Sequence, residues 1–147
     1  LRLFLPRDMA DITYYGLGPV ESYQDKRKAS YHDEFHANVK VLHEDYIRPQ
    51  ENGSHDECDY VKAEGSRISL AAVSADTFAF NASVYTQEEL TEKAHNYELN
   101  ASPYTVLCLD HRQNGIGSNS CGPRLLEQYR FAENEFTFAI SLLPVVK

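Results

Sequence analysis

The sequence predicts an all-β protein, an antiparallel β-sandwich with one short helix. Apolar residues alternate with polar residues at a period of two in several separate runs, which is the pattern of strands that bury one face. These runs are rich in aromatic and β-branched residues, which favour strands. Glycine, proline, asparagine and aspartate separate the runs, as in antiparallel sheets whose strands are joined by turns.

The alternation locates the strands along the chain. It opens the chain, where Leu1, Leu3 and Leu5 recur at every second position, and it closes the chain from Phe136 to Leu142. A further strand-like run follows a glycine-rich stretch near residue 120. The predicted strands cover residues 1–5, 35–42, 78–80, 104–109, 125–131 and 136–142.

One segment, residues 86–95, is predicted to be a helix instead. It begins with Thr86-x-x-Glu89, the spacing of a capping box. Acidic residues fill its first turn and basic residues its last, which suits the helix dipole. Leu90 and Ala94 are four residues apart, so we expect both to face the sheet.

Two polar stretches are predicted to be loops. Residues 110–123, D-H-R-Q-N-G-I-G-S-N-S-C-G-P, contain three glycines and many turn formers. This connection is longer than two strands need, and such loops are often functional, although an ordinary surface loop is the alternative. Residues 50–59, Q-E-N-G-S-H-D-E-C-D, are the most polar stretch, and the Asn-Gly pair in it marks a tight turn. We expect that stretch to be exposed.

The totals limit the classes of function. A chain of 147 residues suits one domain, so we expect residues 1–147 to form a single domain. The net charge of −8 disfavours nucleic acid and anionic membranes as partners. Three cysteines without a C-x-x-C pair indicate a reducing, cytoplasmic location rather than a disulfide framework. Because the chain starts with a strand-like run and without methionine, we expect it to begin inside a larger polypeptide.

Metal binding and thiol chemistry are both weakly indicated. His32 and His36 are four residues apart, but in a strand-like stretch they would lie about 13 Å apart, so we favour surface histidines over a metal site. Cys121 and His111 could form a Cys–His pair, but no third orienting group is evident. We favour a cysteine that simply fits a tight loop.

Paired carboxylates are the third candidate chemistry. Twenty-two acidic residues offer many pairs, so their presence alone is uninformative. Glu21 and Asp25 lie beside Tyr23 and Lys26, and we interpret these four residues as a structural network.

Four short segments resemble bacterial β-galactosidases of glycoside hydrolase family 2. Residues 16–26, G-L-G-P-V-E-S-Y-Q-D-K, resemble the family's G-L-G-P-x-E-x-Y-x-D-R segment. Residues 49–53, P-Q-E-N-G, look like its P-x-E-N-G segment, and residues 85–90 are similar to its short helix entry. Residues 115–123, G-I-G-S-N-S-C-G-P, look like its G-(I/V)-G-S-x-S-C-G-P loop. The segments occur in family order and span nearly the whole chain.

The resemblance implies the C-terminal, small-chain region (domain 5) of such an enzyme, and about the second half of that domain. That domain is part of a galactose-mutarotase-like supersandwich. The enzyme would be a retaining hydrolase of terminal β-D-galactosides such as lactose. Its catalytic glutamates and its magnesium ion would belong to a barrel upstream, so the resemblance implies no catalytic residue, metal site or cofactor in this chain. A stand-alone carbohydrate-binding module and a purely structural interface domain are the alternatives.

The resemblance also implies a role for the loop at residues 110–123. In some members of the family a tryptophan on this loop stacks on sugar, whereas this chain has no tryptophan and has Cys121 at the corresponding place. We therefore expect the loop to line the rim of the pocket, with Asn119, Ser120 and Cys121 as the substrate-binding candidates. The implied partners are the catalytic barrel or large subunit, the galactoside, and further copies of the enzyme in a homo-oligomer.

Overall fold

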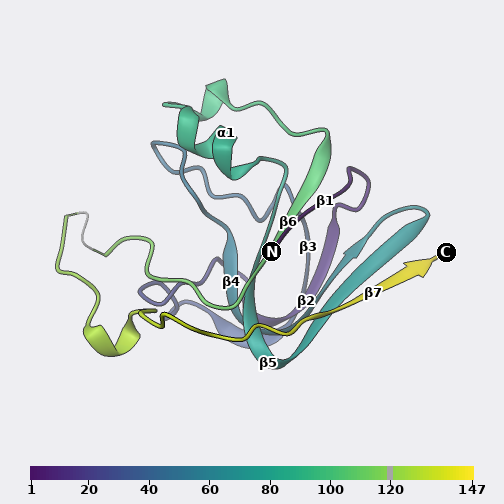
Figure 1. Cartoon of the computed structure of the whole chain (residues 1–147). Coiled ribbons are helices and arrows are strands. Elements are labelled where there is room, and N and C mark those ends of the chain that lie inside the picture. Colours follow the sequence, from purple (N-terminus) through teal and green to yellow (C-terminus); the bar gives the residue numbers. More distant parts are fainter. Residues whose placement is uncertain (119–120) are drawn as a thin grey trace.

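The computed structural model describes residues 1–118 and 121–147, and over these residues it has seven strands in one antiparallel sheet (Figure 1). The strand order is β1-β6-β5-β4-β2-β3, with β7 paired to β5. The predicted all-β antiparallel fold with one short helix is confirmed, as an open, sandwich-like sheet. The strands are β1 (Arg2–Pro6), β2 (Asp11–Gly18), β3 (Tyr31–Asn38), β4 (Ser54–Glu64), β5 (Ile68–Ser83), β6 (Tyr104–Asp110) and β7 (Ser141–Val146).

The sheet is organised around β5, which has 16 residues. Strand β4 pairs along one edge of β5, with register shifts near Cys58. On the other edge, β7 pairs with Ile68 to Val73 and β6 pairs with Ala79 to Ser83. The segment 111–140 therefore leaves one edge of β5 and returns to the same edge, and in Figure 1 it extends away from the C-terminal end of β7.

An apolar core lies between these strands, with Tyr14 of β2 near its centre. Tyr14 is fully buried, and its ring centroid lies 4.9 Å from that of Phe80, 4.6 Å from that of His55 and 5.3 Å from that of Phe35. Packing of aromatic rings at such distances stabilises a core beyond the area that it buries. The core thus joins β2, β3, β4 and β5 under the loops discussed below.

The predicted helix is present but shorter than expected. Helix α1 spans Gln87–Glu92, and the Thr86 hydroxyl accepts a hydrogen bond from the Glu89 amide at 3.1 Å, as the N-cap spacing predicts. Leu90 is buried as expected, whereas Ala94 lies beyond the helix end and is exposed. Within the described residues, no helix has the length and apolar character needed to cross a membrane.

Two predicted strands are wrong in position. Residues 125–131 contain a 3₁₀ turn, η2 (Glu127–Tyr129), and Leu126 is 64% exposed. Alternation alone does not make a strand, because a strand also needs a partner strand, and none of residues 125–131 pairs with one. The last strand begins at Ser141, so most of the predicted run 136–142 precedes it. Its Phe138 and Ile140 still pack against the core.

Three further strand boundaries differ from the prediction. The predicted exposed loop at residues 50–59 is wrong, because β4 begins at Ser54 and buries His55 and Cys58. Strand β2 had no prediction, because its last three residues, Gly16 to Gly18, are all buried and break the alternation. Strand β3 ends at Asn38, well before the predicted residue 42.

Candidate functional site

Three loops that are distant in the sequence meet at one place in the structure. They are the 19–26 loop after β2, the 49–53 loop before β4 and the 111–123 loop after β6. The Ser22 amide donates to the Ser54 carbonyl at 2.7 Å, which joins the first loop to the start of β4. Three of the four sequence segments that resemble one family are therefore neighbours in space.

Glu21 is the buried centre of this meeting point. Its side chain is 1% exposed, and it accepts hydrogen bonds from the Lys26 ammonium, the Tyr46 hydroxyl and the Gly53 amide, the last at 2.7 Å. A buried carboxylate needs such partners to offset its lost hydration. Partial desolvation alone would lower the pKa of Lys26, but the bonds with Glu21 and Tyr46 raise it, so the ion pair persists at neutral pH.

Asp25 holds the 111–123 loop. Its Oδ1 accepts a hydrogen bond from the Ile116 amide at 2.9 Å, and its Oδ2 accepts from the Gly117 amide at 3.0 Å. The same Oδ2 accepts from the Ser118 amide at 2.8 Å and from the Ser118 hydroxyl at 2.7 Å. Desolvation would raise the pKa of Asp25, but these bonds lower it below its ordinary value. Of the four residues interpreted as a structural network, Glu21, Tyr23 and Lys26 are joined to one another by hydrogen bonds, whereas the carboxylate of Asp25 bonds to a second loop.

The loops line an open cavity of about 720 Å³ with both polar and apolar walls. Its lining includes residues 116–118, which Asp25 holds, as well as Lys26 and Tyr46. A volume of this order accommodates a small ligand such as a sugar. The full lining is Asp25, Lys26, Tyr46, Gln50, Ile116, Gly117, Ser118, Gly122 and Pro123.

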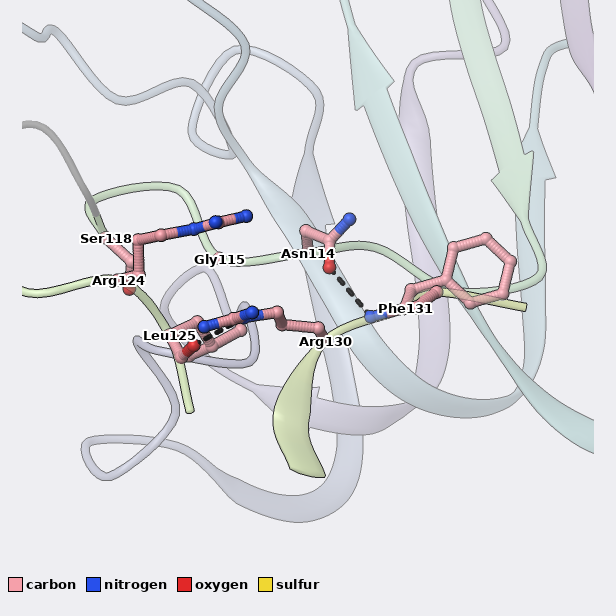
Figure 2. A pocket seen from close by; sticks show the side chains of 8 residues that line it. Asn114, Gly115, Ser118, Arg124, Leu125, Arg130 and Phe131 are labelled. Atoms are coloured by element: carbon pink, nitrogen blue, oxygen red, sulfur yellow. Dashed lines mark hydrogen bonds between the residues drawn. The ribbon is translucent and has the colours of Figure 1, made fainter. Parts of the chain in front are cut away.

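A second cavity of about 410 Å³ (Figure 2) shares Ser118 in its lining with the first. Figure 2 shows Arg124 and Arg130 extending into it from opposite sides. The Arg130 Nε donates to the Leu125 carbonyl at 2.6 Å, and the Phe131 amide donates to the Asn114 side chain at 2.8 Å. These bonds fold the later part of the segment back onto its beginning.

The predicted rim residues can be placed only in part. Cys121 is exposed and precedes Gly122 and Pro123, which line the larger cavity. Asn119 and Ser120 lie outside the residues that the structure describes.

The other sequence candidates have ordinary structural surroundings. His111 stacks on Phe136 with ring centroids 4.7 Å apart, whereas Cys121 is exposed to solvent. His32 bonds the Glu57 carbonyl at 2.9 Å and His36 bonds the Thr13 hydroxyl at 2.8 Å, and both histidines are exposed. Within residues 1–118 and 121–147, no group of three His, Cys, Asp or Glu residues is arranged to hold a metal ion.

The sequence reasoning missed several lining residues. Tyr46 and Gln50 come from an irregular segment without alternation, and Arg124 and Arg130 were placed in or beside a predicted strand. Their only sequence signal was proximity to the recognised motifs. Contacts between distant segments decide which residues line the cavities, and a single sequence does not record those contacts.

Comparison with known proteins gives consistent matches over the whole site. The family described as "Beta galactosidase small chain" matches residues 1–142. The β-galactosidase of Actinobacillus pleuropneumoniae is 48% identical over 143 residues, covering 97% of this chain and 14% of that protein. The β-galactosidase of Staphylococcus xylosus is 42% identical over 142 residues, with the same two coverages of 97% and 14%. The β-galactosidase of Lactococcus lactis is 31% identical over 142 residues, covering 96% of this chain and 14% of that protein.

Proposed function

Because the chain belongs to the beta galactosidase small chain family, we propose that it is the non-catalytic C-terminal β-sandwich of a β-galactosidase. The chain spans about 14% of the length of the β-galactosidases that it matches. In this proposal the rest of the enzyme supplies the barrel, the catalytic glutamates and the magnesium ion. The enzyme hydrolyses terminal β-D-galactosides such as lactose, with retention of configuration, and this chain alone is inactive.

The larger cavity is the observation that carries the proposal. A retaining glycosidase needs two carboxyl groups about 5–5.5 Å apart. In the part of the lining that the structure describes, Asp25 is the one carboxylate, and four hydrogen bonds already engage it. Lys26, Tyr46 and the loop backbone offer polar groups of the kind that bind sugar hydroxyls. This chemistry suits a wall that binds substrate better than a centre that transfers protons.

The 111–123 loop is the proposed rim of the active site. Asn119 and Ser120 would donate or accept hydrogen bonds to sugar hydroxyls, and Cys121 would occupy the place of an aromatic residue in some relatives. The exposed position of Cys121 supports this role, since an exposed side chain beside the cavity is free to meet a ligand.

The proposed partners are the catalytic barrel or large subunit and further copies of the enzyme, which we propose to be cytoplasmic. Strand β7 supports an assembly role, because its residues are exposed and include Leu143, Val145 and Val146. A stand-alone carbohydrate-binding module and a purely structural interface domain remain the alternative functions.

A hybrid enzyme tests the proposal. The matching region of the Actinobacillus pleuropneumoniae β-galactosidase, 48% identical, is replaced by this chain, and hydrolysis of nitrophenyl β-D-galactoside is compared with that of the parent and of a deletion lacking the region. We expect the hybrid to be active and the deletion to be inactive. An active deletion would contradict the rim role. Calorimetric titration of the isolated chain with galactose and lactose separates the alternatives, because binding by the chain alone favours the module.

A further inference from the structure

Three consecutive residues of the 111–123 loop direct their backbone amides at one carboxylate. The amides of Ile116, Gly117 and Ser118 all lie within 3.0 Å of the Asp25 oxygens, and the Ser118 hydroxyl adds a fourth bond at 2.7 Å. Successive backbone amides that converge in this way form a concave anion-binding nest. Here the anion is a side chain of the same protein, so the nest works as a clamp between two loops.

The Asp25 end of this clamp is fixed to the core. Tyr23 is 2% exposed, and its hydroxyl accepts a hydrogen bond from the Ser54 amide of β4 at 3.3 Å. The backbones of Tyr23 and Lys26 exchange two hydrogen bonds of 3.0 Å, which close the turn that carries Asp25. Asp25 therefore presents its carboxylate from a turn that β4 holds in place.

The other end of the clamp is shaped to receive the carboxylate. A Cβ atom at Gly115 would overlap both the Oδ2 and the Cγ of Asp25, so the close approach requires glycine at this position. The clamped residues Ile116, Gly117 and Ser118 in turn form a wall of the larger cavity. The position of this wall thus depends on a contact between residues 91 positions apart, Asp25 and Ile116.

We propose that Asp25 is a positioning residue for galactoside binding, which sets the place of the 116–118 cavity wall without touching the reacting atoms. This inference rests on the proposed function, because it takes the larger cavity as part of the galactoside pocket. Charge-assisted hydrogen bonds are the strong ones, so removing the charge while keeping the shape releases the wall. Release of this wall should weaken substrate binding rather than slow the chemical step, since in the proposed function the catalytic groups lie in another part of the enzyme.

The first experiment measures the clamp itself in the 147-residue chain. Amide hydrogen exchange is compared between the native chain and Asp25→Asn, with Asp76→Asn as the control, because Asp76 is also an exposed aspartate. We expect exchange at residues 116–118 to accelerate about tenfold or more in Asp25→Asn and not in the control, because local opening is measured directly by exchange. Equal exchange in both variants would overturn the clamp.

The second experiment measures positioning in the hybrid enzyme. We expect Asp25→Asn to raise KM for galactosides about fivefold with kcat within about twofold, the pattern of lost binding rather than lost chemistry. Gly115→Ala displaces the carboxylate from the other side and should likewise raise KM with little change in kcat. Ser118→Ala, which removes one of the four hydrogen bonds, should raise KM less. An unchanged KM in a variant whose residues 116–118 exchange faster would overturn the positioning role. An inactive native hybrid would refute the proposed function instead, while the exchange result would still report on the clamp.

Discussion

The Oε2 atom of Glu21 lies 2.7 Å from the backbone nitrogen of Gly53, and this buried hydrogen bond joins two loops that are 32 residues apart. The other oxygen of the same carboxylate accepts bonds from Lys26 and Tyr46. One side chain thus satisfies a backbone amide, an ammonium group and a phenol. The arrangement of the 19–26 and 49–53 loops depends on its charge.

The first prediction concerns Glu21→Gln. Replacing a buried carboxylate by an amide weakens three hydrogen bonds, and we expect the free energy of unfolding to fall by about 2 kcal/mol. Lys26 is half-exposed, so its ammonium group is hydrated when the ion pair is lost, and this hydration limits the loss of stability. Denaturant unfolding of the chain measures the difference, with the exposed Glu92→Gln as the control. Equal stability of the two variants would show that the network is not structural.

The second prediction is a pH dependence of stability. Burial lowers the pKa of His55 from 6.5 to about 4, although the bond with the Leu17 carbonyl partly opposes the shift. The folded chain therefore keeps His55 neutral where the unfolded chain binds a proton. Stability from this residue is present above pH 6.5 and is lost as the pH falls towards 4, by up to about 3 kcal/mol.

Two measurements check the role of His55. The free energy of unfolding should decrease as the pH is lowered from 7 to 4, both in the native chain and in the exposed control His36→Gln. It should decrease less steeply in His55→Gln. The proton resonances of the His55 ring provide a test in the native chain, independent of any variant. A midpoint near 6.5 for these resonances would contradict the prediction.

The third prediction compares two glycines. A Cβ atom at Gly16 would overlap the Cys58 Sγ and lie 3.0 Å from the Cys58 Cα, whereas one at Gly122 would meet nothing within 4 Å. Overpacking a buried strand contact costs about 1–3 kcal/mol. We expect Gly16→Ala to lower the melting temperature clearly and Gly122→Ala to leave it unchanged. Similar melting temperatures would mean that β2 and β4 can separate without cost.

The fourth prediction concerns the cysteines. Cys121 is exposed, so Cys121→Ser in the hybrid enzyme should change KM or acceptor preference while stability stays within about 0.5 kcal/mol. Cys108 is buried, so Cys108→Ser places a more polar hydroxyl in a buried site and should lower stability instead. Thermal unfolding and steady-state kinetics measure both effects. Unchanged kinetics for a folded Cys121→Ser enzyme would remove this residue from the rim.

The fifth prediction concerns β7, whose pairing within the described residues is with β5 alone. Val145 is 56% exposed on this strand, and exposed apolar edge strands favour association. We expect the isolated chain to self-associate in sedimentation experiments and Val145→Lys to reduce the association. Val41→Lys, at a position 76% exposed outside any strand, is the matched control and should not change it. A monomeric native chain would count against an interface on β7.

The sequence predicted strands where apolar and polar residues alternate regularly, and it missed strands where the buried residues break that alternation. The alternation located β1 and β6 and part of β5. It missed β4, because that strand begins by burying polar Ser54 and His55, and His55 is held by the Tyr14 hydroxyl and the Leu17 carbonyl as well as by its aromatic neighbours. The motifs identified the loops of the candidate site. The contact between Asp25 and the 116–118 amides could not be predicted, since it depends on how β2 and β6 are placed in the sheet.

The shared edge of β5 has a consequence for how this family of domains varies. Asp110 pairs with Ala79 and Ser141 pairs with Val73 on the same edge of one strand, so the intervening segment begins and ends at fixed neighbouring points. Insertions and deletions between these points change the segment while leaving the register of the sheet intact. Changes in the length and chemistry of this segment should therefore cost little in folding.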